Sequence, residues 1–354
     1  MDPNSLKALQ GAAGGEPVQP VIAVAHDGSP YISVYPWTSG TGFGTKYSDP
    51  THTPPGLGQA ISFSPDGKAL ALVTSGTFGI QVWSWSSSGF GTKYSDPATL
   101  NYTSTGVFGV DFSPDGADLA CVHYCGGGDS FFSVWPWSSS GFGTIYSDPT
   151  STFVNYGVKV QFSPDGTTIA ASEAASPYIG VWPWSSGFGT KYANPSPGVN
   201  GYGDGMSWNH DGTAIAVTER TSPYVTVWPW SSGFGTKYSD PSTLPAGAAY
   251  SLKWSPDGTD VAVPHAGSPY ISVYPWSSGF GTKYANPSTL PTGQGNSASF
   301  SPDGADLAVA HRVSPYISVY PWSSGFGTKY ANPSTLPHST STTYGGIYVA
   351  FSPA

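Results

Sequence analysis

One sequence unit repeats seven times along this chain of 354 residues. Each copy is close to SPYISVYPWSSGFGTKYANPSTLP and is followed by FSPDG and a short apolar run. The second Trp of the WPW-type signature recurs at steps of 48, 52, 47, 46, 46 and 46 residues. A fixed period of this size, with several short strand-like segments per unit, is typical of a radial array of small β-sheets, or blades. The signature residues are Trp37, Trp85, Trp137, Trp184, Trp230, Trp276 and Trp322.

The unit that begins at Ser251 shows how one blade is built. Residues 251–254 alternate between polar and apolar side chains, which is the period of a strand with one buried face. The SPDG that follows is a tight turn, because Pro presets φ, Asp bonds its own backbone and Gly accepts a positive φ. Three further strands are predicted at 261–265, 270–276 and 280–284.

This order of an inner strand ending in FSPDG, two middle strands and an outer strand resembles the WD-repeat β-propeller family. The resemblance covers the chain from about Val21 onward, with WPW or close variants in place of the usual His and Trp-Asp pair. It implies an all-β fold, a seven-bladed β-propeller of four-stranded antiparallel blades.

The two ends of the repeat array predict how the ring closes. The array starts on a second strand, Val21 to His26, and finishes on an inner strand, Ile347 to Ser352. We expect these two strands to pair in one shared blade, because pairing removes two open sheet edges. The predicted domains are therefore an N-terminal arm, residues 1–20, and one propeller, residues 21–354.

The arm differs in composition from the repeats. We expect a helix of under two turns, with Leu6 and Leu9 on one face, followed by a glycine-rich tether. So short a helix is unstable alone and would order only by docking, either on the propeller or on a partner. We expect the arm to anchor the propeller to a partner protein through these two leucines.

Charge and composition exclude several classes of function. The net charge is −9, and only two of the 12 basic residues are arginines, Arg220 and Arg312. Nucleic-acid binding needs clustered Lys and Arg, so it is not expected. Two arginines also cannot supply the cluster that sialidase-like propellers use against a carboxylate. No signal peptide or membrane-spanning stretch is visible, so neither membrane insertion nor secretion is expected.

Polar residues end the second strand of most units and would form a ring on the face that carries the blade-crossing loops. We expect this ring to face a ligand, with imidazoles that titrate at about pH 6 to 7. Capping of nearby backbone groups is the alternative. Neighbours on such a ring are too far apart to share a metal at about 2 Å, so neither a metal nor another cofactor is expected. The ring comprises His26, His123, Glu173, Glu219, His265 and His311.

Three stretches depart from the repeat, at residues 124–129, 151–157 and 197–205. They belong to neighbouring blades and should cluster on the same face as the ring. Variable loops on a rigid scaffold commonly carry recognition, although drift without function is the alternative. The candidate recognition residues are Tyr124, Asp129, Tyr156 and Tyr202.

The chain shows no nucleophile elbow, phosphate loop or HExxH motif, so a non-enzymatic role is expected. The near-identical SPYISVYPWSSGFGTKY repeats resemble propellers encoded by tailed bacteriophages. That resemblance implies a virion component, such as a decoration, tail or host-attachment protein, located in the virion among other virion proteins. The alternative is a cytoplasmic protein, either a glycan-binding lectin that recognises a surface glycan or a protein-interaction scaffold.

Overall fold

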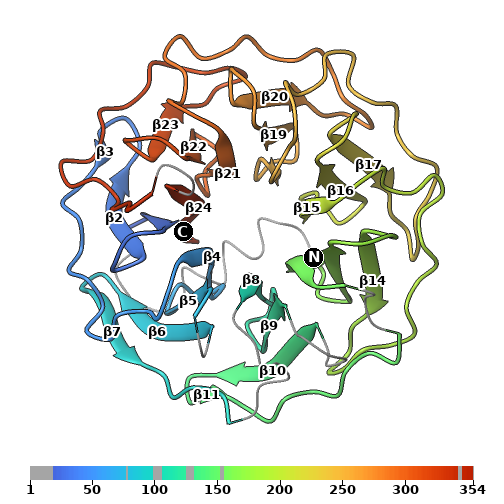
Figure 1. Ribbon diagram of the computed structural model, residues 1–354, viewed down its shortest axis with the longest axis horizontal. Helices are drawn as coiled ribbons and strands as arrows, with labels where there is room; N and C mark the ends of the chain where they lie inside the picture. Colours follow the sequence, from blue (N-terminus) through green and yellow to red (C-terminus); the bar gives the residue numbers. More distant parts are fainter. Residues whose placement is uncertain are drawn as a thin grey trace.

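The computed structural model describes residues 19–76, 79–98, 106–124, 131–151, 155–341 and 345–353. Within these ranges the chain forms seven antiparallel sheets around one axis (Figure 1). The protein is a seven-bladed β-propeller, which confirms the fold predicted from the period. No helix of the described ranges is long and apolar enough to cross a membrane. The proposed arm, with Leu6 and Leu9, lies almost entirely outside them.

Three of the described sheets have four strands, and we number them blades 1 to 3. Blade 1 contains β24 (Gly346–Phe351), β1 (Val21–His26), β2 (Ile32–Thr38) and β3 (Gly42–Phe43). Blade 2 contains β4 (Gly58–Phe63), β5 (Ala69–Thr74), β6 (Ile80–Ser86) and β7 (Gly89–Lys93). Blade 3 contains β8 (Val107–Phe112), β9 (Asp118–His123), β10 (Phe132–Ser138) and β11 (Gly141–Phe142).

The other four sheets, blades 4 to 7, have three strands each. Their outer segment joins the sheet by a single bridge, such as Trp184 with Phe188, so the predicted fourth strand is reduced there. Blade 4 contains β12 (Gly157–Phe162), β13 (Thr168–Glu173) and β14 (Ile179–Pro183), and blade 5 contains β15 (Gly203–Trp208), β16 (Ala214–Glu219) and β17 (Val225–Pro229). Blade 6 contains β18 (Lys253–Trp254), β19 (Asp260–Pro264) and β20 (Ile271–Pro275), and blade 7 contains β21 (Gly295–Phe300), β22 (Asp306–His311) and β23 (Ile317–Pro321).

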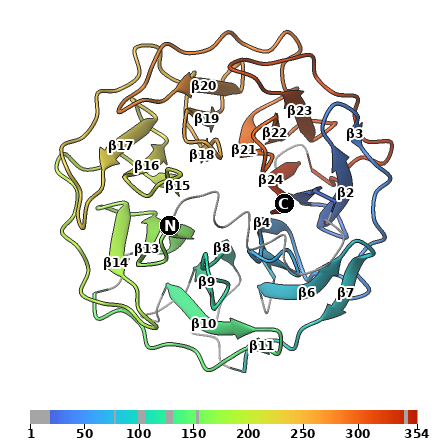
Figure 2. The same ribbon diagram turned by 180° about the vertical axis from the view of Figure 1, so that it is seen from behind.

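Blade 1 closes the ring as the sequence predicts. β24 supplies the inner strand and pairs antiparallel with β1, from Ile22 opposite Phe351 to Ala25 opposite Tyr348. Figure 2 shows β24 among the inner strands of the other blades, next to the central axis. Strands from both ends of the repeat array therefore share one sheet, and no blade edge is left open at the closure.

The core lies between adjacent blades, where large aromatic rings pack edge to face. Trp37 contacts Tyr330 of blade 7 with ring centroids 5.0 Å apart, and Trp184 contacts Tyr146 of blade 3 at 5.2 Å. Both tryptophans are buried. Aromatic pairs in this geometry add to the burial energy, so the repeated aromatics hold neighbouring blades together.

Three of the seven seams between blades also share a hydrogen-bond motif built on a buried aspartate. The carboxylate of Asp306 accepts from the indole N–H of Trp37 at 2.9 Å and from the hydroxyl of Tyr330 at 2.8 Å. The carboxylates of two other aspartates accept in the same way. Asp118 accepts from Trp184 and Tyr146, and Asp260 accepts from Trp322 and Tyr284, all at 2.9 Å. We call this arrangement the seam carboxylate.

Candidate functional site

The ring of strand-ending residues is buried inside the blades. His26 and His311 are each 0% exposed, and each donates to or accepts from a serine of the next strand, Ser33 or Ser318, at 3.0 Å. Burial lowers the pKa of each ring histidine to about 4, below the range expected from the sequence; the four are His26, His123, His265 and His311.

The two glutamates of the ring are buried as well. Glu219 accepts from the hydroxyl of Thr226 at 2.7 Å and from the backbone N–H of Asn200 at 2.8 Å, and its pKa is raised by burial. Glu173 is 1% exposed. A ligand at this ring would have to displace internal contacts, so its role in binding stays a prediction.

The variable loops bring the candidate tyrosines together. Tyr156 lies between Tyr124 and Tyr202, with ring centroids 5.5 Å and 6.1 Å away, and Phe108 of β8 packs against it at 5.5 Å. The hydroxyl of Tyr202 donates to that of Tyr156 at 2.5 Å. We call these four residues the aromatic arc. Asp129, the fourth candidate in these loops, lies outside the described residues.

The aromatic arc borders a cavity of about 240 Å³ on the propeller axis, which we call the mouth cavity. All seven inner strands, or the residues next to them, contribute to its wall. Because these strands converge on the centre (Figure 2), their channel-facing side chains meet although they are far apart in sequence. The polar and charged lining residues are Gln59, Lys159, Asp204, Arg220, Tyr250, Ser251, Gln294, Asn296, Arg312 and Tyr348.

Arg220 links the mouth cavity to the aromatic arc. Its guanidinium donates two hydrogen bonds of 2.8 Å to the two carboxylate oxygens of Asp204. It also lies over the ring of Tyr202, 4.0 Å from the centroid. The Asp204 side chain is 8% exposed, whereas that of Arg220 is 51% exposed. Burial raises the pKa of Asp204 against the opposing effect of Arg220, so this carboxylate is more basic than an ordinary one.

Arg312 and Lys159 add two further cations to the same cavity. The Nε of Arg312 is buried and has no hydrogen-bond partner among the described residues. Its guanidinium lies 6.0 Å from the ring centroid of Tyr250. The ammonium of Lys159 donates to the hydroxyl of Tyr348 at 2.5 Å and lies 4.1 Å from that ring's centroid. The cavity thus gathers three cations and one carboxylate.

A second axial cavity of about 320 Å³ lies on the side of the SPDG turns, which we call the turn-side cavity. It meets the mouth cavity at Lys159, Ser251 and Tyr348, which line both. Asp111 of β8 lies in its wall and accepts from the backbone N–H of Phe162 at 3.0 Å. Burial raises the pKa of Asp111 to about 6, and the Lys159 and Lys253 charges oppose that rise.

Reasoning from the sequence missed this axial site. Its residues come mainly from the inner strands of seven different repeats, and no single repeat shows that they meet. A signal was present, because Lys159 and Asp204 place charges in inner strands that are otherwise mostly apolar or small. A second signal was that both arginines of the chain occupy the same place in their repeats. Arg220 directly follows the ring residue Glu219, and Arg312 directly follows the ring residue His311. The two arginines prove to line the same cavity.

No family model and no curated protein match this chain, but solved structures share its fold. The periplasmic gluconolactonase of Pseudomonas aeruginosa has a TM-score of 0.65 at 15% identity, covering 94% of this chain and 99% of its own. A candidate 6-phosphogluconolactonase from Bacteroides fragilis has a TM-score of 0.69 at 13% identity, covering 94% and 98%. The β-propeller domain of Cps50 (Swd1) from Myceliophteria thermophila has a TM-score of 0.58 at 12% identity, covering 79% and 88%. The fold is shared at these identities.

These comparisons correct the function expected from the sequence. The non-enzymatic role as a phage virion component is contradicted, because structural neighbours are named as a gluconolactonase and as candidate 6-phosphogluconolactonases. The resemblance to phage-encoded propellers rested on the sequence of the repeat, whose aromatic residues pack between blades in this structure. The seams constrain those residues, whereas the mouth cavity is lined by residues that differ between repeats.

Proposed function

We propose that the protein is an enzyme-type propeller that binds a small, anionic, hydroxylated molecule in the mouth cavity and hydrolyses its lactone ring. One observation carries the proposal: Lys159, Arg220 and Arg312 converge on a cavity lined by all seven inner strands. The lactonase names of the structural neighbours support the reaction class.

The charge of the cavity supports an anionic ligand. The chain as a whole carries a net charge of −9, yet the charged residues of this cavity are three cations and the carboxylate of Asp204. A concave wall of low dielectric focuses such a local field. Guanidinium groups match carboxylate and phosphate geometry, and the unpartnered Nε of Arg312 is a donor available for one.

The remaining wall suits a hydroxylated ring. Tyr250, Gln294 and Asn296 supply neutral donors and acceptors around the cations. The amide of Gln294 donates to Asn296 at 3.0 Å, and that of Asn296 donates to the backbone oxygen of Gly346 at 2.8 Å, which orients both side chains. A few fixed polar groups in a mainly preformed cavity are the usual basis of small-molecule specificity.

Lactone hydrolysis can be assigned to these groups with a balanced reaction. Water adds to the ring carbonyl carbon, the acyl–oxygen bond breaks, and the leaving alkoxide takes up a proton to give a hydroxy acid. Asp204, more basic through burial and held by Arg220, would accept the proton of the attacking water. The charge that develops on the carbonyl oxygen would face the cation of Lys159 or Arg312.

The test is hydrolysis of glucono-1,5-lactone and its 6-phosphate, followed as acid release above the spontaneous rate. We expect Arg312→Met to lower kcat/KM at least about tenfold, because a charged hydrogen bond is lost. Lys237→Met is the matched control, since that cation pairs with Asp240 on the outer rim. It should leave the rate unchanged.

A wild-type rate equal to the spontaneous rate with both lactones would overturn the proposed reaction. Equal effects of Arg312→Met and Lys237→Met would overturn the assignment to the mouth cavity. Asp204→Asn distinguishes proton transfer from ligand binding. For a proton acceptor, kcat should fall while KM changes little.

A further inference from the structure

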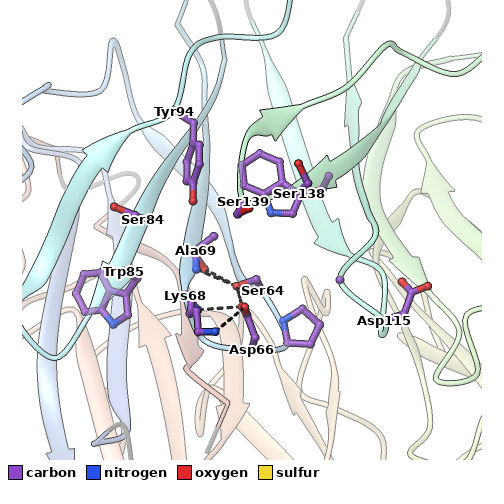
Figure 3. A pocket seen from close by; sticks show the side chains of 13 residues that line it. Ser64, Asp66, Lys68, Ala69, Ser84, Trp85, Tyr94, Asp115, Ser138 and Ser139 are labelled. Atoms are coloured by element: carbon purple, nitrogen blue, oxygen red, sulfur yellow. Dashed lines mark hydrogen bonds and ion pairs between the residues drawn. The ribbon is translucent and has the colours of Figure 1, made fainter. Parts of the chain in front are cut away.

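A third pocket, of about 650 Å³, lies at the seam between blades 2 and 3 (Figure 3). It is lined by the turn between β4 and β5, by the turn between β8 and β9 of blade 3, and by aromatic residues of both blades. Its position is that of the seam carboxylate in the three seams described above. At this seam the corresponding residue is Ala69, which pairs with Ser84 as Asp118 pairs with Pro136.

The two donors of the motif are nevertheless kept. Tyr94 and Trp137 pack edge to face at 4.9 Å, as Tyr146 and Trp184 do at 5.2 Å in the next seam. Figure 3 shows the hydroxyl of Tyr94 directed toward Ala69. Within the part of the chain that the structure describes, neither the Tyr94 hydroxyl nor the Trp137 indole N–H has an acceptor.

We propose that this seam binds the carboxylate group of a separate ligand in the place of the missing aspartate side chain. The two donors would hold its two oxygens, as Tyr146 and Trp184 hold those of Asp118 at 2.9 Å. Hydrogen bonds to an ionised acceptor are stronger than neutral ones, and the donors are already fixed by packing. The pocket leaves room for more of the ligand beyond the carboxylate.

The charges around the pocket are compatible with an anion. Asp66 and Asp115 of the SPDG turns line it, together with Lys68, whose ammonium lies 3.7 Å from Asp66. Both aspartates are held by their own turns, through the hydroxyls of Ser64 and Ser113 at 2.6 Å. The seam between blades 3 and 4 has the same surroundings, because its SPDG turns contain Asp115 and Asp165. That seam nevertheless holds the buried carboxylate of Asp118, so two nearby turn aspartates do not prevent a carboxylate from binding there.

Other seams show why an opening is needed. Next to Val21, which takes the aspartate position in blade 1, the indole N–H of Trp85 is buried without a partner. The Trp85 ring lines the pocket as the Trp137 ring does, but its N–H is buried away from the pocket space, whereas that of Trp137 is not among the buried unpartnered donors of the described residues. Blade 5 has an alanine at the same position, Ala214, beside Tyr238 and Trp276. This second alanine seam must be blocked when the first one is tested.

The test follows the indole N–H resonance of Trp137, assigned with Trp137→Phe, in the full-length Ala214→Asp protein. The probes are acetate, with acetamide as its neutral control, and an acetylated dipeptide with a free or an amidated C-terminus. We expect acetate at concentrations on the order of 10–100 mM to shift the resonance and acetamide to leave it unchanged. A response to the free dipeptide but not its amide would identify peptide carboxylates as ligands as well.

Two variants connect the response to the seam. Ala69→Asp supplies the carboxylate covalently and should abolish the acetate response while raising the unfolding midpoint. Tyr94→Phe removes one donor and should weaken acetate binding at least about tenfold. An unmoved Trp137 resonance with every carboxylate, or an unchanged response in Tyr94→Phe, would overturn the proposal even if Ala69→Asp fails to fold.

Discussion

Replacing Asp306 by alanine should destabilise the seam between blades 7 and 1 by about 2–4 kcal/mol. The side chain is 0% exposed and accepts hydrogen bonds from Trp37 at 2.9 Å and from Tyr330 at 2.8 Å. Each hydrogen bond to a charged group contributes about 1.5–3 kcal/mol, and the two donors are left without an acceptor. The free energy no longer needed to desolvate the carboxylate offsets part of this loss.

The assay is unfolding in urea followed by tryptophan fluorescence at pH 7. Asp260→Ala removes the same pair of contacts at the seam of blades 6 and 7, so it should cost a similar free energy. Asp49→Ala removes only an exposed ion pair with Lys46 and should cost less than about 1 kcal/mol. If Asp306→Ala lowers the free energy of unfolding only as little as Asp49→Ala does, and less than Asp260→Ala, the seam carboxylate does not stabilise the ring as argued.

Two further predictions concern pH. The pKa of each of the four ring histidines is about 4 in the folded protein and about 6.5 in the unfolded chain. The free energy of unfolding is therefore highest above pH 6.5 and falls as the pH drops toward 4, by on the order of 3 kcal/mol for each histidine. Urea midpoints measured from pH 8 to pH 4 check this, and a flat profile would contradict it. Burial raises the pKa of Asp111 to about 6, because the ionised form is poorly solvated in the folded protein. The contribution of this carboxyl to folding is therefore most favourable below about pH 4, where it is protonated, and is lost as the pH rises through 6. Asp111→Asn should therefore add about 1–2 kcal/mol at pH 8 and almost nothing at pH 3.5, and an equal gain at both would refute the cause.

The blades could be predicted from the sequence because each unit contains its own local signals. SPDG defines a turn whatever surrounds it, and the structure shows Asp66 accepting from the hydroxyl of Ser64 and the backbone N–H of Lys68. Alternating apolar residues define strands, and the incomplete units at the two ends of the array predicted the pairing of β24 with β1. The outer strands were overestimated in four blades, where GFGTKY follows the third strand through one bridge and a few backbone hydrogen bonds, such as Tyr192 to Val181 at 2.9 Å, without forming a regular ladder.

The axial site could not be predicted in the same way. Whether Lys159 and Asp204 point toward the channel or between blades depends on how seven sheets tilt around the axis, and no single repeat contains that information. The burial of the histidines could not be predicted either. Their polar character favoured a ligand-facing ring, yet His26 and His311 contact Ser33 and Ser318 inside the blade, and a role of the ring in binding stays a prediction.

Arg220 and Arg312 occupy equivalent places in their repeats, directly after the strand-ending ring residue. Substitution there changes what the axial opening can attract, while the tryptophans and aspartates that join the blades lie elsewhere in the unit. Selection, or a protein designer, could therefore change the charge of the mouth cavity at Arg220 or Arg312 without rebuilding the scaffold.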